Sequence, residues 1–230
     1  NQKLMLSIDR LDYSKGIIQR LNAFEMFLEK YPEYRQKVSI LMVVVPSRDQ
    51  VEKYKELKEE IDETVGRLNS SYGRISWTPI HYYYRSFALE SLSAFYCMAD
   101  VALVTPMRDG MNLVCKEFIA SKLDKKGVLI LSEMAGASKE LSDSLLINPN
   151  DINAIVEAMY QALTMPVSEQ VKRNTIMQRS LKRYTIHHWV ALFMERLKDV
   201  KNLQQSMATK QLDAESINQI AEHYSNANRR

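Results

Sequence analysis

The sequence predicts an α/β fold, a Rossmann-like parallel sheet covered by helices on both faces and followed by C-terminal helices. Short apolar runs alternate along the chain with helix-length segments whose apolar residues recur every three or four positions. Residues 38–45 and 101–104 have almost no polar break, as expected for strands buried on both faces. Strands separated by helices form parallel sheets with right-handed crossovers.

The first predicted unit is a strand at residues 4–8 and a helix at 17–30, whose apolar residues have helical spacing. The strand at 38–45 follows, and then a charged helix that we expect to open at residues 46–49 and to run to about residue 69. The alternation continues with strands at 75–81, 101–104, 128–131 and 145–147, and helices at 87–98, 113–122 and 152–163.

Three regions are expected. Residues 1–165 form the Rossmann-like domain, residues 166–200 form C-terminal helices (171–184 and 186–198) that pack on it, and residues 201–230 form a polar helical tail or linker. The chain begins only three residues before its first strand, which suggests that it was cut from a longer protein.

Composition limits the function classes. With 230 residues, 46% of them hydrophobic, the chain can bury one substantial core. We expect a cytoplasmic protein with no membrane partner, because no apolar run approaches the roughly 20 residues that cross a bilayer and no secretory signal is present. A net charge of +3 is too slight to indicate nucleic acid. Cys97 and Cys115 are expected to be small buried hydrophobic residues.

The most informative segment is residues 108–117, where a glycine turn and a helix beginning near Asn112 follow the strand at 101–104. Exposed amides and the positive end of the helix dipole suit a phosphate there. Ligands of open parallel sheets bind beyond the carboxyl ends of the strands. The loops at these ends carry charged residues that predict a diphosphate site or two phosphate sites, namely Asp9, Arg10, Asp12, Lys15, Arg48, Arg85, Arg108 and Asp109.

Several familiar phosphate sites are absent from the sequence. The six glycines never form G-x-G, and there is no G-K-[ST], so a dinucleotide fingerprint and a P-loop are excluded. No D-x-D is present to hold a metal ion against a diphosphate. His187 and His188 are adjacent on a helix and point about 100° apart, which favours a structural role. We therefore expect no cofactor and no metal. If a diphosphate is the leaving group, Arg10 and Lys15 would have to supply the positive charge that a metal supplies elsewhere.

The motifs S-I-D-R-L-D-Y-S-K-G, V-P-S-R and L-V-T-P-M-R-D-G-M-N-L-V-C-K-E resemble those of the trehalose-6-phosphate synthase family, from about residue 4 to residue 197. Members of that family are retaining glycosyltransferases built from two Rossmann-like domains, the GT-B fold. The resemblance implies that this chain is the C-terminal half, which binds UDP-glucose. It also implies that the N-terminal domain, with most of the acceptor pocket for glucose 6-phosphate, is missing.

The resemblance assigns roles by position. Arg10 and Lys15 would hold the diphosphate, Asp109 would bond glucose hydroxyls, and Glu117 would take the ribose diol. Arg48 would reach the phosphate of the acceptor, and Phe87 would lie beside the uracil. The main-chain amides that would meet sugar and phosphate oxygens are those of Gly110, Met111, Asn112, Leu113 and Val114. Leu113 and Glu117 are one helical turn apart, so one helix could contact both ends of a nucleoside diphosphate.

The family retains the anomeric configuration, and the resemblance implies that the departing phosphate oxygen takes the acceptor proton. Catalysis would then be mainly orientation and charge stabilisation of leaving UDP. This sequence departs from the family pattern in two ways, and we expect them to have different effects. Cys115 replaces the usual alanine with little effect, whereas without an N-terminal domain the isolated chain should bind weakly and be inactive.

Two other functions remain open, a non-catalytic sensor of sugar nucleotides or sugar phosphates and a related retaining glycosyltransferase with another phosphorylated acceptor. Residues 217–230 resemble the lead-in to the phosphatase domain of two-domain relatives, so such a domain is a further expected partner. The phosphatase D-x-D motif itself is not in this sequence.

Overall fold

A computed structural model describes residues 2–48, 50–183, 185–208 and 214–227. In this part of the chain six parallel strands form one sheet in the order β3-β2-β1-β4-β5-β6. The strands are β1 (Lys3–Arg10), β2 (Val38–Val45), β3 (Ile80–Tyr84), β4 (Val101–Val104), β5 (Val128–Ser132) and β6 (Leu145–Ile147). The order of strands reverses its direction between β1 and β4, so the loops after these two strands meet at the point where ligands of such folds bind.

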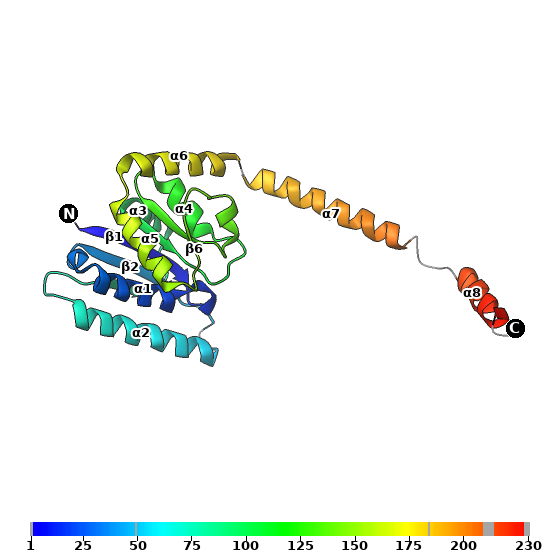
Figure 1. Ribbon diagram of the computed structural model, residues 1–230, viewed down its shortest axis with the longest axis horizontal. Helices are drawn as coiled ribbons and strands as arrows, with labels where there is room; N and C mark the ends of the chain where they lie inside the picture. The colour runs from blue at the N-terminus through cyan, green and yellow to red at the C-terminus, as the bar shows by residue number, and fades with distance from the viewer. Residues whose placement is uncertain (1, 49, 184, 209–213, 228–230) are drawn as a thin grey trace. The chain divides into compact units, whose positions relative to one another are not determined.

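Helices connect the strands and cover the sheet (Figure 1). The helices of the described residues, including those of the C-terminal part, are α1 (Ile17–Lys30), α2 (Glu52–Tyr72), α3 (Leu89–Met98), α4 (Leu113–Ser121), α5 (Ile152–Thr164), α6 (Val167–Arg183), α7 (Ile186–Ala208) and α8 (Ala214–Ala227). Three short 3-10 helices are η1 (Tyr13–Lys15), η2 (Pro32–Tyr34) and η3 (Gly136–Lys139). The predicted α/β class and parallel sheet are confirmed.

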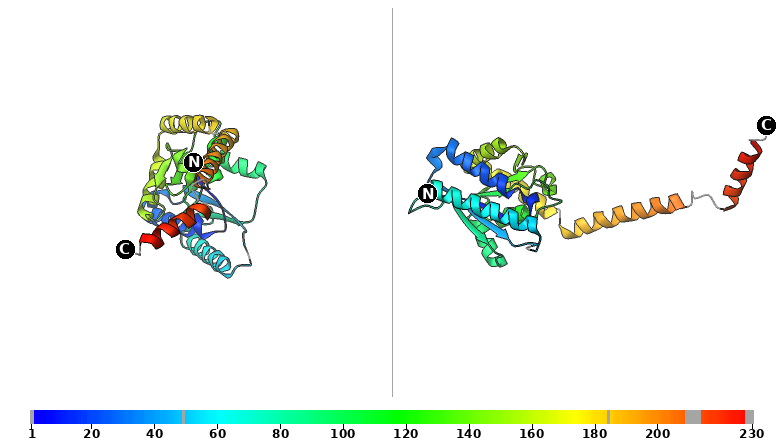
Figure 2. Two further views of the ribbon diagram at one scale, coloured as in Figure 1. Left: turned by 90° about the vertical axis from the view of Figure 1, so that its right-hand side faces the viewer. Right: turned by 90° about the horizontal axis from the view of Figure 1, so that it is seen from below.

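The core consists of two apolar layers, one on each face of the sheet. Alternate strand residues point to opposite faces, so Ile40 and Met42 of β2 join one layer while Leu41 and Val43 join the other. Helices α1, α2 and α5 pack on the first face, and α3, α4 and α6 pack on the second (Figures 1 and 2). Because helices cover both faces of the sheet, the strands β2 and β4 consist almost entirely of apolar residues.

Two elements differ from the prediction. The third strand lies at Ile80–Tyr84 instead of 75–81, because Arg74 and Trp77 pair with each other in a tight turn before it. The second helix begins at Glu52 instead of at residues 46–49. Arg48 has a left-handed backbone (φ 53°), which helical residues do not adopt. Asp49 lies outside the described residues.

The C-terminal part is helical. Helix α6 begins at Val167, four residues before the predicted start, and α7 continues to Ala208, into the region from residue 201 that was predicted as a polar helical tail or linker. The chain divides into two compact units, residues 1–182 and 183–230. The first unit contains nearly all of α6, whose Met177 is buried in the second apolar layer. The division into the three predicted regions stays a prediction.

Arg20 is the most unusual residue of the core, because its side chain is fully buried on α1. Its guanidinium bonds to Asp9 Oδ2 at 2.7 Å and to the Ser7 hydroxyl, both on β1. It also donates to Thr105 Oγ1 (3.0 Å), just after β4, and to the Lys15 carbonyl oxygen (3.1 Å). One buried cation thus joins α1, β1 and both loops at the point where the strand order reverses.

We expect Arg20→Met to lower the free energy of unfolding by about 3–5 kcal/mol, because it leaves the Asp9 carboxylate buried without its partner. Chemical denaturation monitored by circular dichroism measures this change. The double variant Arg20→Met/Asp9→Asn should recover part of the loss, since no uncompensated charge remains.

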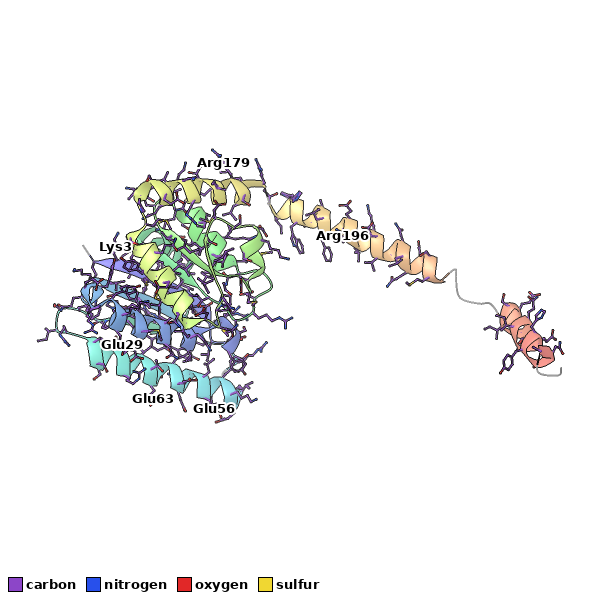
Figure 3. The ribbon with its side chains drawn as sticks, in the orientation of Figure 1. Lys3, Glu29, Glu56, Glu63, Arg179 and Arg196 are labelled. Carbon is purple, nitrogen blue, oxygen red and sulfur yellow. The ribbon has the colours of Figure 1, made fainter. Side chains whose placement is uncertain are left out.

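The matched control is Arg179→Met, at an exposed arginine on the outer side of α6 (Figure 3). It should change the free energy of unfolding by less than about 0.5 kcal/mol. Equal effects of the two single substitutions would contradict the role given to the buried ion pair.

Candidate functional site

The loops after β1 and β4 are bonded to each other. The amide of Met107 donates to the Ser14 carbonyl oxygen at 2.7 Å. Gly16, between η1 and α1, has a left-handed backbone (φ 64°), and a Cβ on it would lie 2.4 Å from the Thr105 carbonyl oxygen. Only glycine allows the two loops to approach this closely. The predicted meeting of charged loops at one edge is therefore present for these two loops.

Lys15 and Asp109 form an ion pair across this junction. The distance from Lys15 Nζ to Asp109 Oδ2 is 2.6 Å, and both side chains are largely buried. The Asp109 carboxylate also accepts the Met111 amide (3.3 Å) and the Asn112 side-chain amide (3.2 Å). Burial alone would raise the pKa of Asp109, but the hydrogen bonds and the Lys15 charge outweigh it and lower this pKa. Asp109 is therefore ionised at neutral pH.

Helix α4 presents its N-terminus at the same junction. Asn112 precedes the helix with φ 77°, and its Oδ1 caps the helix by accepting the Cys115 amide (3.1 Å). The amides of Leu113 and Val114 make no hydrogen bond to other described residues. These free donors and the helix dipole favour an anion at this end of α4, and the phosphate site itself stays a prediction.

A loop that sequence reasoning missed supports this end of α4. The amide of Gly136, at the start of η3, donates to the Asp109 carbonyl oxygen at 2.9 Å. The amide of Ala137 donates to the Met111 carbonyl oxygen, also at 2.9 Å. A Cβ at Gly136 would lie 2.1 Å from the Gly110 carbonyl oxygen. A glycine soon after a buried strand was the available signal, but it did not reveal which loop it would meet.

Arg48 belongs to the same edge, although it is exposed. It donates to the Tyr54 hydroxyl of α2 at 2.7 Å, and the Tyr54 ring packs against Tyr13 of η1 with ring centroids 4.9 Å apart. Burial by itself would raise the pKa of Asp12, but hydrogen bonds from Ser14 and the Lys15 and Arg48 charges lower it. Arg48 is thus held beside the loop that carries Lys15.

Arg10 is the last residue of β1 and is exposed, directly before the junction loop. Its side chain makes no hydrogen bond or ion pair with other residues that the structure describes, so it is available to a ligand. The structure therefore brings Lys15 and Asp109 into contact, with Asp109 also bonded to Met111 and Asn112 just before α4. It leaves Arg10 at the end of β1 without a partner among the described residues.

Phe87 lies in the loop between β3 and α3, and Glu117 lies on α4, both on the side of the second apolar layer. Phe87 contacts the rings of Tyr83 and Phe95, and the Arg85 guanidinium lies 4.5 Å from its centroid. Phe87 packs against the same apolar cluster as Met111 and Val114. Glu117 is exposed on α4, one turn after Leu113. No hydrogen bond or ring contact joins the Phe87 cluster to Lys15 or Asp109 among the described residues.

The cysteine prediction is half right. Cys115 is buried, and burial raises its pKa to about 12, so it is a poor nucleophile. Cys97 was expected to be buried but is exposed, because its position on α3 faces away from the apolar layer that buries Tyr96. In the described part of the chain no three His, Cys, Asp or Glu residues are grouped as metal ligands.

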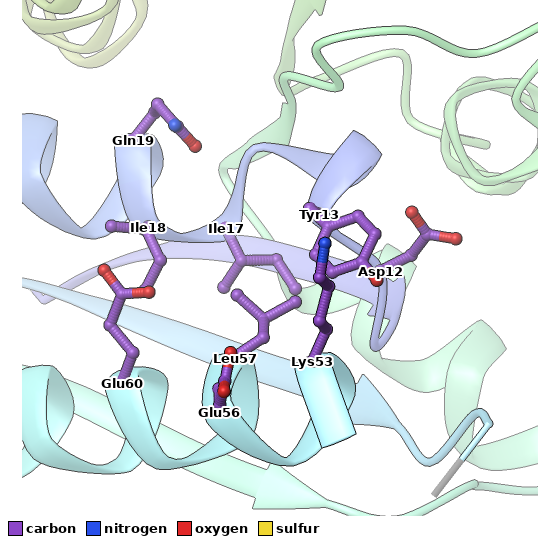
Figure 4. A pocket seen from close by; sticks show the side chains of 9 residues that line it. All are labelled: Asp12, Tyr13, Ile17, Ile18, Gln19, Lys53, Glu56, Leu57 and Glu60. Carbon is purple, nitrogen blue, oxygen red and sulfur yellow. The ribbon is translucent and has the colours of Figure 1, made fainter. Parts of the chain in front are cut away.

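A separate groove of about 350 Å³ lies between α1 and α2 (Figure 4). Its walls combine apolar Ile17, Ile18 and Leu57 with charged Lys53 and Glu56. It touches the junction only through Asp12 and Tyr13 and does not include the N-terminus of α4. No helix within the described residues has the length and apolar character that crossing a membrane requires.

The strand order, the free amides at the start of α4 and the loop that carries Lys15 are typical of Rossmann-like domains of the nucleotide-binding class. The family model of glycosyltransferase family 20 matches residues 1–199, and the chain belongs to this family. The resemblance noted in the sequence is therefore confirmed at the level of the family, while placement in the C-terminal half stays a prediction.

Curated relatives of this chain are named as trehalose-phosphate synthases. A bifunctional trehalose-6-phosphate synthase/phosphatase of Thermoproteus tenax is 46% identical over 230 residues, which is 99% of this chain and 32% of the relative. An α,α-trehalose-phosphate synthase [UDP-forming] of Dictyostelium discoideum is 41% identical over 94% of this chain and 30% of its own length. The chain thus spans about a third of the length of these relatives.

Solved structures share the fold. The UDP-forming α,α-trehalose-phosphate synthase of Burkholderia xenovorans, in complex with glucose 6-phosphate, has a TM-score of 0.83 and 39% identity, over 86% of this chain and 44% of that one. An Escherichia coli structure described as trehalose-6-phosphate bound with UDP-2-fluoro glucose has the same TM-score, identity and coverage. These similarities confirm the Rossmann-like half of a GT-B fold.

We expect Gly136→Ala to displace the loop at Gly110, because the new methyl group would overlap the Gly110 carbonyl oxygen. The free energy of unfolding should fall by about 1–3 kcal/mol. Hydrogen exchange should accelerate most at the amides of positions 136 and 137, which hold this loop. Gly66→Ala is the control, since its Cβ would meet nothing within 4 Å on α2, and it should be neutral or stabilising.

The stability advantage of the wild type over Asp109→Asn should depend on pH. The pKa of Asp109 is lowered in the fold from its usual 3.8, so the contribution is fully present above that value. It should be lost as the pH falls through the lower folded pKa. Urea denaturation of both proteins between pH 7 and pH 2.5 measures the difference, and an advantage that grows on acidification would contradict the ion pair.

Proposed function

We propose that the whole protein transfers glucose from UDP-glucose to glucose 6-phosphate with retention, and that this chain binds the donor. The observation that carries the proposal is the junction of Lys15, Asp109 and the free amides of α4 at the strand-order reversal. Membership of glycosyltransferase family 20 and the names of its relatives support the choice of substrates. The cytoplasmic location stays a prediction from the sequence.

In this proposal the donor lies over the junction. Arg10 and Lys15 hold the diphosphate together with the amides of residues 110–114, and Asp109 accepts hydroxyls of the glucose. Glu117 takes the ribose diol, and Phe87 lies beside the uracil. Lys15 must then exchange at least part of its contact with Asp109 for the diphosphate, which leaves a carboxylate oxygen for the sugar.

The acceptor would approach from the side of Arg48, whose guanidinium is fixed by Tyr54 beside η1. Arg48 would bind the phosphate of glucose 6-phosphate, and protein outside this chain would complete that pocket. This incomplete acceptor pocket is the reason that we expect the isolated chain to be inactive. A phosphatase domain elsewhere in the protein is a further proposed partner, suggested by the bifunctional relative.

The proposed reaction needs no protein nucleophile. The bond from the anomeric carbon to the departing phosphate oxygen breaks while the acceptor hydroxyl bonds to the same face. That phosphate oxygen takes the hydroxyl proton. Arg10, Lys15 and the α4 amides stabilise the charge that develops on UDP, so the chain itself supplies the positive charge and no metal ion is required.

A pair of substitutions should separate donor from acceptor binding. Lys15→Ala should weaken the binding of UDP by about 2–5 kcal/mol, because it removes a largely buried charge at the diphosphate. It should leave the affinity for glucose 6-phosphate nearly unchanged. Arg48→Ala should weaken the binding of glucose 6-phosphate and leave the affinity for UDP nearly unchanged. Isothermal titration of the full-length protein with each ligand measures both effects.

UDP at 100 times its Kd should stabilise the wild type by about 2.7 kcal/mol, which thermal unfolding detects independently. Equal UDP binding by the wild type and Lys15→Ala would mean that the diphosphate lies elsewhere. Tight ligand binding without UDP release in the presence of glucose 6-phosphate would favour the sensor, and release with another phosphorylated acceptor would change the acceptor assignment.

A further inference from the structure

Tyr96 is a buried tyrosine that the roles above do not use. It lies on α3 with 2% of its surface exposed, and its ring packs in the second apolar layer with Cys115 and Phe118 of α4. Its hydroxyl donates to Oε2 of Glu117 at 2.7 Å, across the contact between the two helices. A phenylalanine would fill the same space, so the hydroxyl is the feature that needs an explanation.

The hydroxyl acts on the one carboxylate of α4 that faces outward near the phosphate-binding end. Burial raises the pKa of Tyr96, and the hydrogen bond to Glu117 and the Glu117 charge raise it further, so the phenol keeps its proton and remains the donor. Glu117 is exposed, and its Oε1 makes no hydrogen bond to other described residues. The carboxylate is thus held by one oxygen and open to a ligand through the other.

An exposed glutamate normally samples several rotamers, and a ligand that fixes it loses part of its binding energy to side-chain ordering. Tyr96 cannot move with Glu117, because its ring is enclosed by the core. We propose that Tyr96 is a positioning residue, which holds the Glu117 carboxylate in place to accept the two neighbouring hydroxyls of a ribose. This inference rests on the proposed function of Glu117.

The proposal makes the discrimination between ribose and deoxyribose the sensitive readout. A wild-type protein that uses Glu117 for the diol binds UDP more tightly than 2′-deoxyuridine diphosphate. Tyr96→Phe should reduce this preference about three- to tenfold, since the carboxylate must then be ordered by the ligand. The preference should fall mainly because the affinity for UDP decreases, with little change in the affinity for the deoxy compound.

The experiment is isothermal titration of the full-length protein with both nucleotides, for the wild type, Tyr96→Phe and Glu117→Ala. Tyr82→Phe is the matched control, because Tyr82 is a partly buried tyrosine on β3, far along the sheet from α4. It should leave the preference unchanged. In a Glu117→Ala background, Tyr96→Phe should have no further effect on the preference, as expected for two residues that act together.

Three outcomes would overturn the inference. In the first, Tyr96→Phe leaves the preference unchanged, for example by weakening the binding of both nucleotides by the same factor, which is the result of a purely structural role. A wild type that binds UDP and the deoxy compound equally would show that Glu117 does not take the diol, while the diphosphate site at Lys15 would stand. Failure of the wild type to bind UDP at all would overturn the proposed function together with this inference.

Discussion

The buried Arg20 guanidinium is the interaction on which the site depends. It lies beneath the reversal of strand order and bonds to β1, to the residue after β4 and to the loop that carries Lys15. A buried cation is tolerated only where its donors are satisfied, so these partners must keep their positions. The same contacts that fill the core therefore fix the direction in which Lys15 leaves its loop.

This arrangement also explains the balance of charge above the core. Asp9 accompanies Arg20 in the interior, while Asp109 accompanies Lys15 at the surface of the junction. In the proposed function an anion rearranges the second pair, which is largely buried but keeps some solvent exposure at the edge of the sheet. The first pair cannot be rearranged, since a ligand has no access to it. The buried Arg20–Asp9 pair thus supports the fold beneath the junction, and the shallower Lys15–Asp109 pair lies where the ligand is proposed to bind.

Much of the fold follows from the sequence because burial on both faces leaves a clear pattern. Strands β2 and β4 and helix α1 begin and end where their apolar spacing indicates. Strand β3 was misplaced because the Arg74–Trp77 turn is closed by backbone bonds that apolar spacing does not reveal. The junction was predicted from strand-end residues and motifs. Arg20 was missed, because a charged residue in a helical pattern is expected to face solvent.

Residues that support the site escaped prediction for a common reason, since each acts on an element distant in the sequence. Gly136 holds a loop from another strand, and Tyr96 reaches Glu117 across a helix pair. Their effect depends on the register of α4, which Asn112 sets by capping the helix. A cap displaced by one residue would turn Glu117 by about 100° away from Tyr96 and move the free amides from Asp109. One helix start therefore couples the proposed phosphate-binding and ribose-binding ends of the site.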